Sequence, residues 1–389
     1  MVKLGFANGI AQGFGVMVSH AFGAKDFKLL RHYVALSLIL TLIISLLLTI
    51  PTVTASRLLL AWMHTPENII AMADAYIKVI FAGILLTMAY NVLSGILRGI
   101  GDSRTPLYFL ILSSVLNIIL DVVLIVYTGL GTAGAAYATI IAQGVSAVLC
   151  FFYMYRKYDI LRTRHEDYYL DSAGVKNMLA IGVPMALNYS ITAIGTMIMQ
   201  SAVNVFGSSV VAAFTAASKV SNIATQSMPT LGTAMATYCG QNLGAGKYDR
   251  IYAGMRQGLF LCFGAAATAA AICIFGGRFI VSWFVSNPSE EIFSSAMQYL
   301  TIASWFFLPL AMIFLYRNAL QGLDQGLIPM LSGVVELACR FGVIALIPAS
   351  TGFFGVCFAD PAAWAGAGIP LFITYLLWEH RMKQCSMAV

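Results

Sequence analysis

Long apolar stretches separated by short polar connections fill almost the whole sequence. Ten of them match or exceed the about 18 apolar residues that let a helix cross a bilayer, and a shorter run, Gly5–Val18, precedes them. They lie at about Tyr33–Ser56, Ala71–Leu97, Leu107–Tyr127, Thr132–Tyr155, Met178–Val203, Ser208–Tyr238, Gln257–Val285, Phe293–Leu315, Leu327–Ile347 and Phe353–Trp378. None shows the alternating pattern of a barrel strand, and all are too long for one. The pattern therefore predicts an all-α polytopic membrane protein.

Composition is that of a protein built for lipid. Hydrophobic residues make up 60% of the 389 residues and charged residues only 10%, whereas soluble domains carry about 25% charged residues. The formal net charge of +6 comes from scattered basic residues, without the basic, aromatic-interleaved patch of a nucleic-acid-binding protein. We therefore expect the lipid bilayer, and no nucleic acid, as a partner.

Basic residues gather in every second connection between the apolar runs. These connections and the C-terminal tail hold Lys25, Lys28, Arg31, Arg98, Arg104, Arg156, Lys157, Arg162, Arg164, Lys176, Lys247, Arg250, Arg256, Arg381 and Lys383. The alternate connections hold only Arg57 and Arg278. By the positive-inside rule, we expect a multi-pass protein of a bacterial-type cytoplasmic (inner) membrane, with its C-terminus in the cytoplasm.

The second half of the sequence repeats the first. Phe22-Gly23-Ala24 matches Leu243-Gly244-Ala245, 221 residues later, and Leu97-Arg98-Gly99 matches Leu320-Gln321-Gly322, 223 residues later. Two similar helical bundles in one membrane orientation are typical of transporters with parallel repeats. The repeat predicts an N-terminal bundle over residues 1–155, a cytoplasmic linker over 156–175 and a C-terminal bundle over 176–389.

The repeat also predicts helices that this sequence does not contain. The second bundle opens with the apolar run that holds Gly182-Val183-Pro184, and the first bundle has no counterpart of that run. If the two bundles matched, about 45 further residues would precede Met1. We therefore expect an N-terminally truncated form of two pseudo-symmetric six-helix bundles, in which the first bundle lacks its first helix and part of the second.

Four short motifs together resemble the multidrug and toxic compound extrusion (MATE) family. They are Ser19-His20-Ala21-Phe22-Gly23-Ala24-Lys25, its repeat Gly240-Gln241-Asn242-Leu243-Gly244-Ala245-Gly246, Leu97-Arg98-Gly99-Ile100-Gly101-Asp102-Ser103-Arg104-Thr105-Pro106 and Gly182-Val183-Pro184. The resemblance covers essentially the whole chain, with His20 where the family usually has Gln. It implies two six-helix bundles that face each other in a V, and export of organic cations or other amphipaths in exchange for H⁺ or Na⁺.

A carboxylate and an amide lie close together inside one apolar run. Asn117 and Asp121 are four residues apart, so they share one face of a helix, and no Lys or Arg lies within a turn of Asp121. Such a pair can hold a proton or a desolvated Na⁺, or it can act only as a polar clamp between helices. The segment Leu116–Asp121 also resembles the cation site of the DinF-like MATE branch. That branch adds a Thr, here Thr139, and an Asp in the first helix that this sequence lacks.

Ionisable residues also lie inside apolar runs of the second half. Glu336 and Arg340 are four residues apart, which favours an ion pair within one helix, and a direct role in substrate or cation binding stays open. Asp360 lies either at the outer end of its helix or in the transport cavity. The NorM-like branch of the family would place carboxylates at the positions of Thr192 and Leu310, and both are missing here. We therefore expect the cation site in the first bundle.

These features together predict a secondary antiporter that works by alternating access. The expected substrate is an amphipathic small molecule, either an organic cation, a drug or a metabolite, which is exchanged for H⁺ or Na⁺. The alternative is a flippase for a lipid-linked glycan or a lipid of the same broad superfamily, in which Lys219, Arg317 and Arg340 would contact phosphates. No metal-binding, nucleophile-elbow or phosphate-loop motif occurs, so we expect no enzymatic activity and no metal or cofactor beyond the coupling ion. We also expect a monomer.

Overall fold

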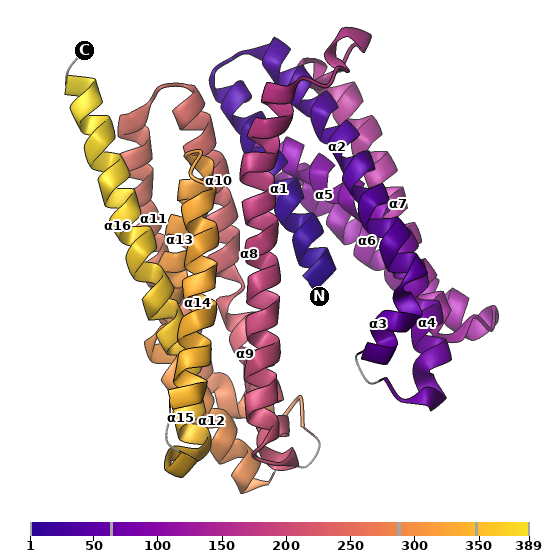
Figure 1. The fold of residues 1–389 in the computed structure, drawn as a ribbon, viewed down its shortest axis with the longest axis vertical. Coiled ribbons are helices and arrows are strands. Elements are labelled where there is room, and N and C mark those ends of the chain that lie inside the picture. The colour runs from indigo at the N-terminus through magenta and orange to yellow at the C-terminus, as the bar shows by residue number, and fades with distance from the viewer. Residues whose placement is uncertain (1, 63–64, 286–288, 347–348, 388–389) are drawn as a thin grey trace. The chain divides into compact units, whose positions relative to one another are not determined.

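The computed structural model describes all residues except 1, 63–64, 286–288, 347–348 and 388–389. Within these residues the chain forms helices and no strands (Figure 1), which confirms the all-α prediction. The elements up to the linker are α1 (Val2–Gly23), α2 (Phe27–Thr54), α3 (Ser56–Trp62), α4 (Glu67–Ala82), α5 (Ile84–Gly99), α6 (Arg104–Val122), the π-helix η1 (Val123–Tyr127), α7 (Gly131–Lys157), η2 (Asp159–Leu161) and η3 (His165–Asp167).

The helices after the linker make up the remainder of the chain. They are α8 (Ser172–Asn204), α9 (Ser208–Thr225), α10 (Ser227–Gly244), α11 (Tyr248–Val281), α12 (Glu290–Trp305), α13 (Phe307–Gly322), α14 (Leu327–Leu346), η4 (Ala349–Thr351), α15 (Gly352–Val356) and α16 (Ala359–Met387). Side-chain caps stand at the starts of α2 and α12. Asp26 accepts a hydrogen bond from the backbone of Leu29 at the start of α2, and Ser289 accepts one from Ile292 at the start of α12.

Nine of the ten predicted apolar runs correspond to candidate membrane spans. In the part of the chain that the structure describes, seven uninterrupted stretches are long and apolar enough to cross a membrane, and two bent helix pairs raise the number to nine. The pair α4–α5 bends by 44° and the pair α12–α13 by 53°. The second bend lies just before Pro309, whose ring nitrogen cannot donate a hydrogen bond to the preceding turn.

The tenth predicted run, Ser208–Tyr238, is divided into α9 and α10, and neither helix is among the candidate spans. The division falls at Gln226, three residues before Pro229. Because proline has no N–H, it cannot bond to the carbonyl of Thr225 one turn earlier, and the helix is free to break there. Apolar length alone did not predict this break.

The chain divides into two compact units. The first unit is Ala7–Gly182, and the second unit is Met1–Phe6 together with Val183–Val389. The polar linker between α7 and α8 therefore belongs to the first unit. The predicted boundaries at 155 and 175 stay a prediction.

A close crossing of two helices recurs in both units. In the first unit, a Cβ atom at Gly99 of α5 would stand 2.8 Å from the carbonyl oxygen of Gly15 of α1. In the second unit, a Cβ atom at Gly322 of α13 would overlap the carbonyl oxygen of Ala236 of α10. These pairs are related by the offsets of 223 and 221 residues found in the sequence, so the internal repeat is present in the packing. Small residues at such crossings let two membrane helices approach closely.

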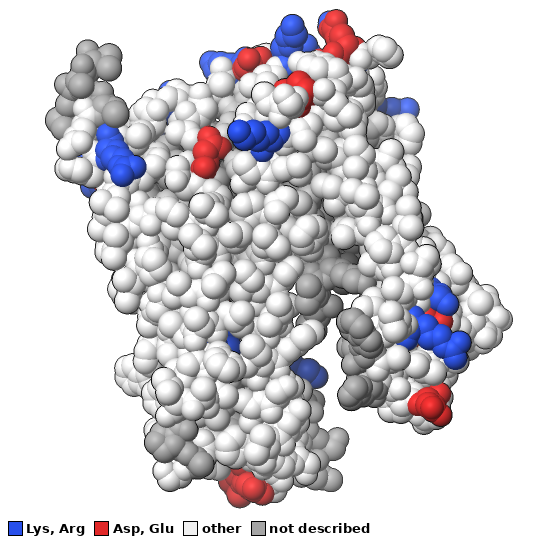
Figure 2. Space-filling model, in the orientation of Figure 1, with Lys and Arg blue, Asp and Glu red and all other residues white. Residues whose placement is uncertain are grey.

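The surface of the long helices is largely uncharged. Figure 2 shows few Lys, Arg, Asp and Glu side chains over the helices on the face in view. Many large apolar side chains are exposed, among them Leu47 at 67%, Ile118 at 64% and Phe260 at 78%. Exposed apolar residues in this density are expected where the solvent is lipid.

Candidate functional site

The carboxylate of Asp121 lies in the last turn of α6, immediately before the π-helix η1. Its Oδ1 atom is buried and has no hydrogen-bond partner among the described residues. Single π-helical turns inside α-helices occur frequently at functional sites. An acceptor oxygen that is buried without a partner costs free energy, so this atom fits a site whose ligand supplies the missing contact.

Glycine allows α7 to pack closely against the π-helix. A Cβ atom at Gly134 would stand 2.8 Å from the carbonyl oxygen of Leu124 and 3.0 Å from its carbon. A larger residue would therefore push α7 away from the turn that follows Asp121.

Asn117 and Thr139 meet across the contact between α6 and α7. The Asn117 Nδ2 atom donates to Thr139 Oγ1 at 3.4 Å, and Thr139 Oγ1 donates to the carbonyl of Ala135 at 3.0 Å. Asn117 lies one turn from Asp121 on the same face of α6. The structure therefore brings all three predicted cation ligands to one region of the first unit, and the Oδ1 atom of Asp121 bonds to neither of the other two. Oxygen atoms of this kind are the ligands that hard cations prefer.

The expected ion pair between Glu336 and Arg340 is present in the second unit. The Arg340 Nη2 atom lies 3.3 Å from Glu336 Oε1 within α14. Arg340 Nε also lies 2.9 Å from Asp360 Oδ1, in the first turn of α16. Asp360 is therefore a partner of Arg340, a relationship that its position in the sequence did not reveal.

Two residues that the sequence did not connect with this pair complete the network. Arg317 Nη2 of α13 donates to Glu336 Oε2 at 2.9 Å, and the Tyr299 hydroxyl of α12 donates to Asp360 Oδ2 at 2.9 Å. Arg317, Glu336 and Arg340 are all less than a tenth exposed. Two guanidinium groups and two carboxylates sum to zero charge, which lowers the cost of placing them inside a membrane protein. The network links four helices of the second unit.

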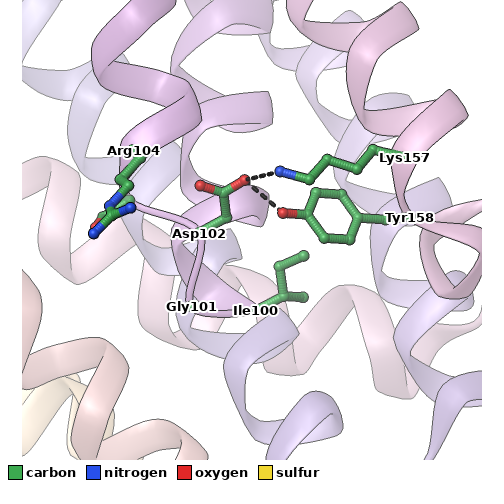
Figure 3. Close-up of a pocket in the computed structure, with 7 residues that line it drawn as sticks. Ile100, Gly101, Asp102, Arg104, Lys157 and Tyr158 are labelled. Atoms are coloured by element: carbon green, nitrogen blue, oxygen red, sulfur yellow. Dashed lines mark hydrogen bonds and ion pairs between the residues drawn. The ribbon is translucent and has the colours of Figure 1, made fainter.

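The motif Leu97–Pro106 forms a joint between α5 and α6, and Asp102 is at its centre. The Asp102 carboxylate accepts hydrogen bonds from the Thr105 backbone at 3.0 Å, the Thr105 hydroxyl at 2.6 Å and the Tyr158 hydroxyl at 2.5 Å. Figure 3 shows Lys157 and Tyr158 pointing at Asp102 from one side, with Arg104 on the other. Burial acts to raise the pKa of Asp102, but the hydrogen bonds from Thr105 and Tyr158 outweigh it and lower this pKa to about 2.

A polar cavity of about 340 Å³ lies beside this joint. It is lined by Ile100, Gly101, Asp102, Ser103, Arg104, Lys157 and Tyr158. Gly101 has a φ angle of 95°, a left-handed conformation that glycine adopts without strain. Because Tyr158 follows the last residue of α7, the hydrogen bond to Asp102 attaches the end of α7 to the α5–α6 turn.

The polar linker is attached to α2 through His32. The His32 Nδ1 atom lies 3.0 Å from the carbonyl oxygen of Asp167, and Nε2 lies 2.7 Å from Asp171 Oδ1. The ring stacks on Tyr169 with centroids 4.1 Å apart. Asp171 Oδ2 accepts the backbone N–H of Gly174 at 2.5 Å in the first turn of α8. This bond from Gly174 and the contact with His32 lower the pKa of Asp171. One buried histidine thus holds both the linker and the start of α8.

Comparison with known proteins shows which family the chain belongs to. The family model MatE matches residues 1–123 and 184–346. The "Probable multidrug resistance protein YpnP" of Bacillus subtilis (strain 168) is 28% identical over 361 residues, which are 92% of this chain and 79% of that protein. The "FAD transporter" of Shewanella oneidensis is 24% identical over 364 residues, 91% of this chain and 77% of that protein.

Solved MATE structures share the fold. A crystal structure of MATE in complex with MaL6 gives a TM-score of 0.92 at 22% sequence identity and covers 99% of this chain and 87% of that chain. An outward-facing MATE family transporter of the MOP superfamily gives a TM-score of 0.91 at 22% identity and covers 99% and 86%. The sequence match and the shared fold agree with the resemblance found in the motifs. The chain belongs to the MatE family, and it is therefore a multi-pass membrane transporter and not an enzyme.

Proposed function

We propose that the chain is a secondary antiporter that exports amphipathic small molecules in exchange for H⁺ or Na⁺, with its cation site at Asp121, Asn117 and Thr139. The observation that carries the proposal is the Asp121 Oδ1 atom, which is buried without a partner in the described residues. The neighbouring Asn117–Thr139 pair supplies further oxygen atoms within one turn of α6. A proton or a Na⁺ ion bound there satisfies the carboxylate and neutralises its charge.

Coupling between cation and substrate follows from the difference in charge between the cation-bound and the cation-free site. Cation binding to Asp121 shifts the equilibrium between the inward-open and outward-open states, because the cation favours one of them. The substrate binds best to the state in which the cation is absent. The coupling is reciprocal, so the substrate weakens cation binding by the same factor by which the cation weakens substrate binding.

Organic cations, drugs or metabolites are the substrate class that the relatives favour. YpnP is named a probable multidrug resistance protein, and the Shewanella oneidensis relative is named an FAD transporter. We place the chain in the DinF-like branch, because the first unit holds the three site residues and no carboxylate occupies Thr192 or Leu310.

The arrangement of the arginine residues supports the antiporter over the flippase. Arg317 and Arg340 each contact a carboxylate, so neither guanidinium is free to neutralise a lipid phosphate. Lys219 is exposed and lies over the ring of Phe284 at 5.3 Å. We propose a monomer in a bacterial-type cytoplasmic membrane with the C-terminus in the cytoplasm, supported by the basic residues of alternate connections.

Efflux of a fluorescent organic cation from proteoliposomes tests the proposal. The protein, its Asp121→Asn variant and its Asp74→Asn variant are compared under an imposed pH gradient and an imposed Na⁺ gradient. Asp74 is a matched control, because it is also a carboxylate in an apolar helix but is already paired with Lys78 at 2.7 Å. We expect gradient-driven efflux from the parent chain and from Asp74→Asn, and none from Asp121→Asn.

Whichever of the two gradients drives efflux, pH or Na⁺, identifies the coupling ion. Equal efflux from the parent chain and from Asp121→Asn would show that the cation site lies elsewhere. If the parent chain moves no organic cation under either gradient but does transfer a labelled lipid-linked sugar between leaflets, the antiporter proposal is wrong and the flippase replaces it.

A further inference from the structure

A buried carbonyl oxygen without a hydrogen-bond partner lies on α7. Among the described residues of the first unit, the Gln143 Oε1 atom, like Asp121 Oδ1, is buried and accepts no hydrogen bond. A glutamine can clamp two helices through its amide NH2 group or through its carbonyl oxygen, but a buried carbonyl oxygen is normally hydrogen-bonded in either case. The structure therefore leaves a polar atom that packing between the helices does not explain.

Gln143 lies on the face of α7 that contacts α6. Thr139, Gln143 and Ser146 are spaced by four and three residues, so they form one stripe along the helix. The two outer members both bond to α6: Thr139 accepts from Asn117 at 3.4 Å, and Ser146 donates to the Phe109 carbonyl at 3.1 Å. Gln143 lies between them and thus belongs to the same α6-facing stripe.

The same two bonds fix the level of Gln143 along α6. Asn117 is opposite Thr139 and Phe109 is opposite Ser146, so the helices run antiparallel, and Ser113 is level with Gln143. Ser113 is buried, with 4% of its surface exposed. At 1.5 Å per residue, Ser113 is about 12 Å from Asp121 along α6, toward the end of the helix that begins at Arg104.

We propose that Gln143 Oε1 and the Ser113 hydroxyl form a second oxygen site for the coupling cation, between Asp121 and the end of α6 that begins at Arg104. The inference rests on the proposed cation site at Asp121 and adds the route by which that site exchanges its ion. The ligand is a monovalent cation, a hydrated proton or Na⁺, because both groups are neutral oxygen donors with no charge of their own.

Further polar groups beyond Gln143 continue the stripe toward the end of α6 that begins at Arg104. Ser146 and the Phe109 carbonyl come next, and Asp102 with Thr105 lies at the start of α6. By the distribution of basic residues this end is cytoplasmic. A neutral intermediate site suits ion passage, because the cation has to be bound favourably enough to enter and weakly enough to leave.

Two separate measurements on the full chain in proteoliposomes test the inference: equilibrium binding of the coupling cation, and the rate of gradient-driven efflux. For Gln143→Leu we expect cation affinity within about twofold of the parent and an efflux rate about tenfold lower, which corresponds to about 1.4 kcal/mol in the barrier. Gln143→Asn keeps a neutral amide oxygen and is expected to recover more of the rate than Gln143→Leu does. A purely structural role predicts the reverse, since leucine fills the space that the shorter asparagine leaves open.

Adjacent serines supply a matched control if the Gln143 variants fold poorly. Ser113→Ala removes the proposed ligand and is expected to slow efflux. Ser114→Ala removes an exposed hydroxyl that donates to the Leu110 carbonyl of its own helix, and is expected to leave the rate unchanged.

The outcomes separate this inference from the function on which it rests. Wild-type efflux in Gln143→Leu and Ser113→Ala, with none in Asp121→Asn, would overturn the second site and leave the antiporter intact. Undiminished coupled efflux in Asp121→Asn would overturn the proposed function itself.

Discussion

Gly99 on α5 lies directly against the backbone carbonyl oxygen of Gly15 on α1, which leaves no room for a side chain between the two helices. In Gly99→Ala the added Cβ atom would stand 2.8 Å from that oxygen, so the helices have to separate. We expect a loss of about 1–3 kcal/mol in the free energy of unfolding, as for other overpacked sites.

Thermal unfolding of the detergent-solubilised protein measures this loss. Gly264→Ala in α11 is the control, because a Cβ atom there meets nothing within 4 Å. Alanine is a better helix former than glycine, so the control is expected to be equally or more stable. An unchanged melting temperature in Gly99→Ala would show that α1 and α5 can move apart at little cost in free energy.

The charge network of the second unit is expected to be sensitive to removal of one member. Arg340→Met leaves Asp360 without its arginine and Glu336 with only Arg317. Breaking a buried pair in this way destabilises a protein by about 3–5 kcal/mol. Denaturation in a detergent series measures the effect.

A second substitution tests whether unpaired charge is the cause. In Arg340→Met with Asp360→Asn, the carboxylate that lost its partner is also removed, so part of the stability is expected to return. A double variant no more stable than the single one would assign the loss to packing and not to charge.

Tyr158 controls the pH dependence of the joint between α5 and α6. Burial alone would raise the pKa of Asp102, but hydrogen bonds from Thr105 and Tyr158 bring it to about 2. A lowered carboxyl pKa stabilises the folded protein above the unfolded value of about 3.9, and this contribution is lost as the pH falls toward 2.

Tyr158→Phe removes one of these hydrogen bonds, so the pKa of Asp102 is expected to rise. The variant should be less stable than the parent at pH 7 by about 1 kcal/mol, and the difference should shrink between pH 4 and pH 2. Melting temperatures across this range provide the check. A difference that stays constant with pH would show that Tyr158 stabilises by packing alone.

His32 is expected to protect the linker from proteolysis. His32→Phe keeps the ring that stacks on Tyr169 but removes both contacts, to the Asp167 carbonyl and to the Asp171 carboxylate. We expect faster cleavage by trypsin after Arg162 and Arg164, because local opening exposes the linker.

A time course of limited trypsin digestion measures the rate, with His380→Phe, at an exposed position of α16, as the control. If both variants are cleaved at the parental rate, the contacts of His32 do not hold the linker in place.

The candidate site shows where sequence reasoning succeeded and where it stopped. The spacing of Asn117 and Asp121 placed them on one face of a helix, and the spacing of Glu336 and Arg340 predicted their ion pair. Such contacts depend only on the geometry of a single helix. The partners Arg317 and Asp360 come from other helices, so they required the packing of the second unit.

The same limit applies to the fold. Apolar length predicted ten runs, of which nine are candidate spans among the described residues, but it did not predict the break between α9 and α10, which depends on Pro229. The repeat predicted from Gly99 and Gly322 was found in the packing. The predicted truncation of the first bundle, by contrast, stays a prediction. An unpaired oxygen such as Gln143 Oε1 leaves no mark in the sequence, since it is defined by what its neighbours fail to supply.

One turn away from the recurring helix crossing, the two units place their small residue on opposite helices of the pair. In the first unit the small residue is Gly95 on α5, which faces the carbonyl of Ala11. In the second unit Gly232 on α10 makes room for Asn318 on α13. The total volume at the crossing is what each half has to keep, and either helix can carry the larger residue. A larger residue at one of these positions is therefore expected to be tolerated only when the residue opposite becomes smaller. Among related sequences the two positions of a pair should covary, and neither position by itself should always be glycine.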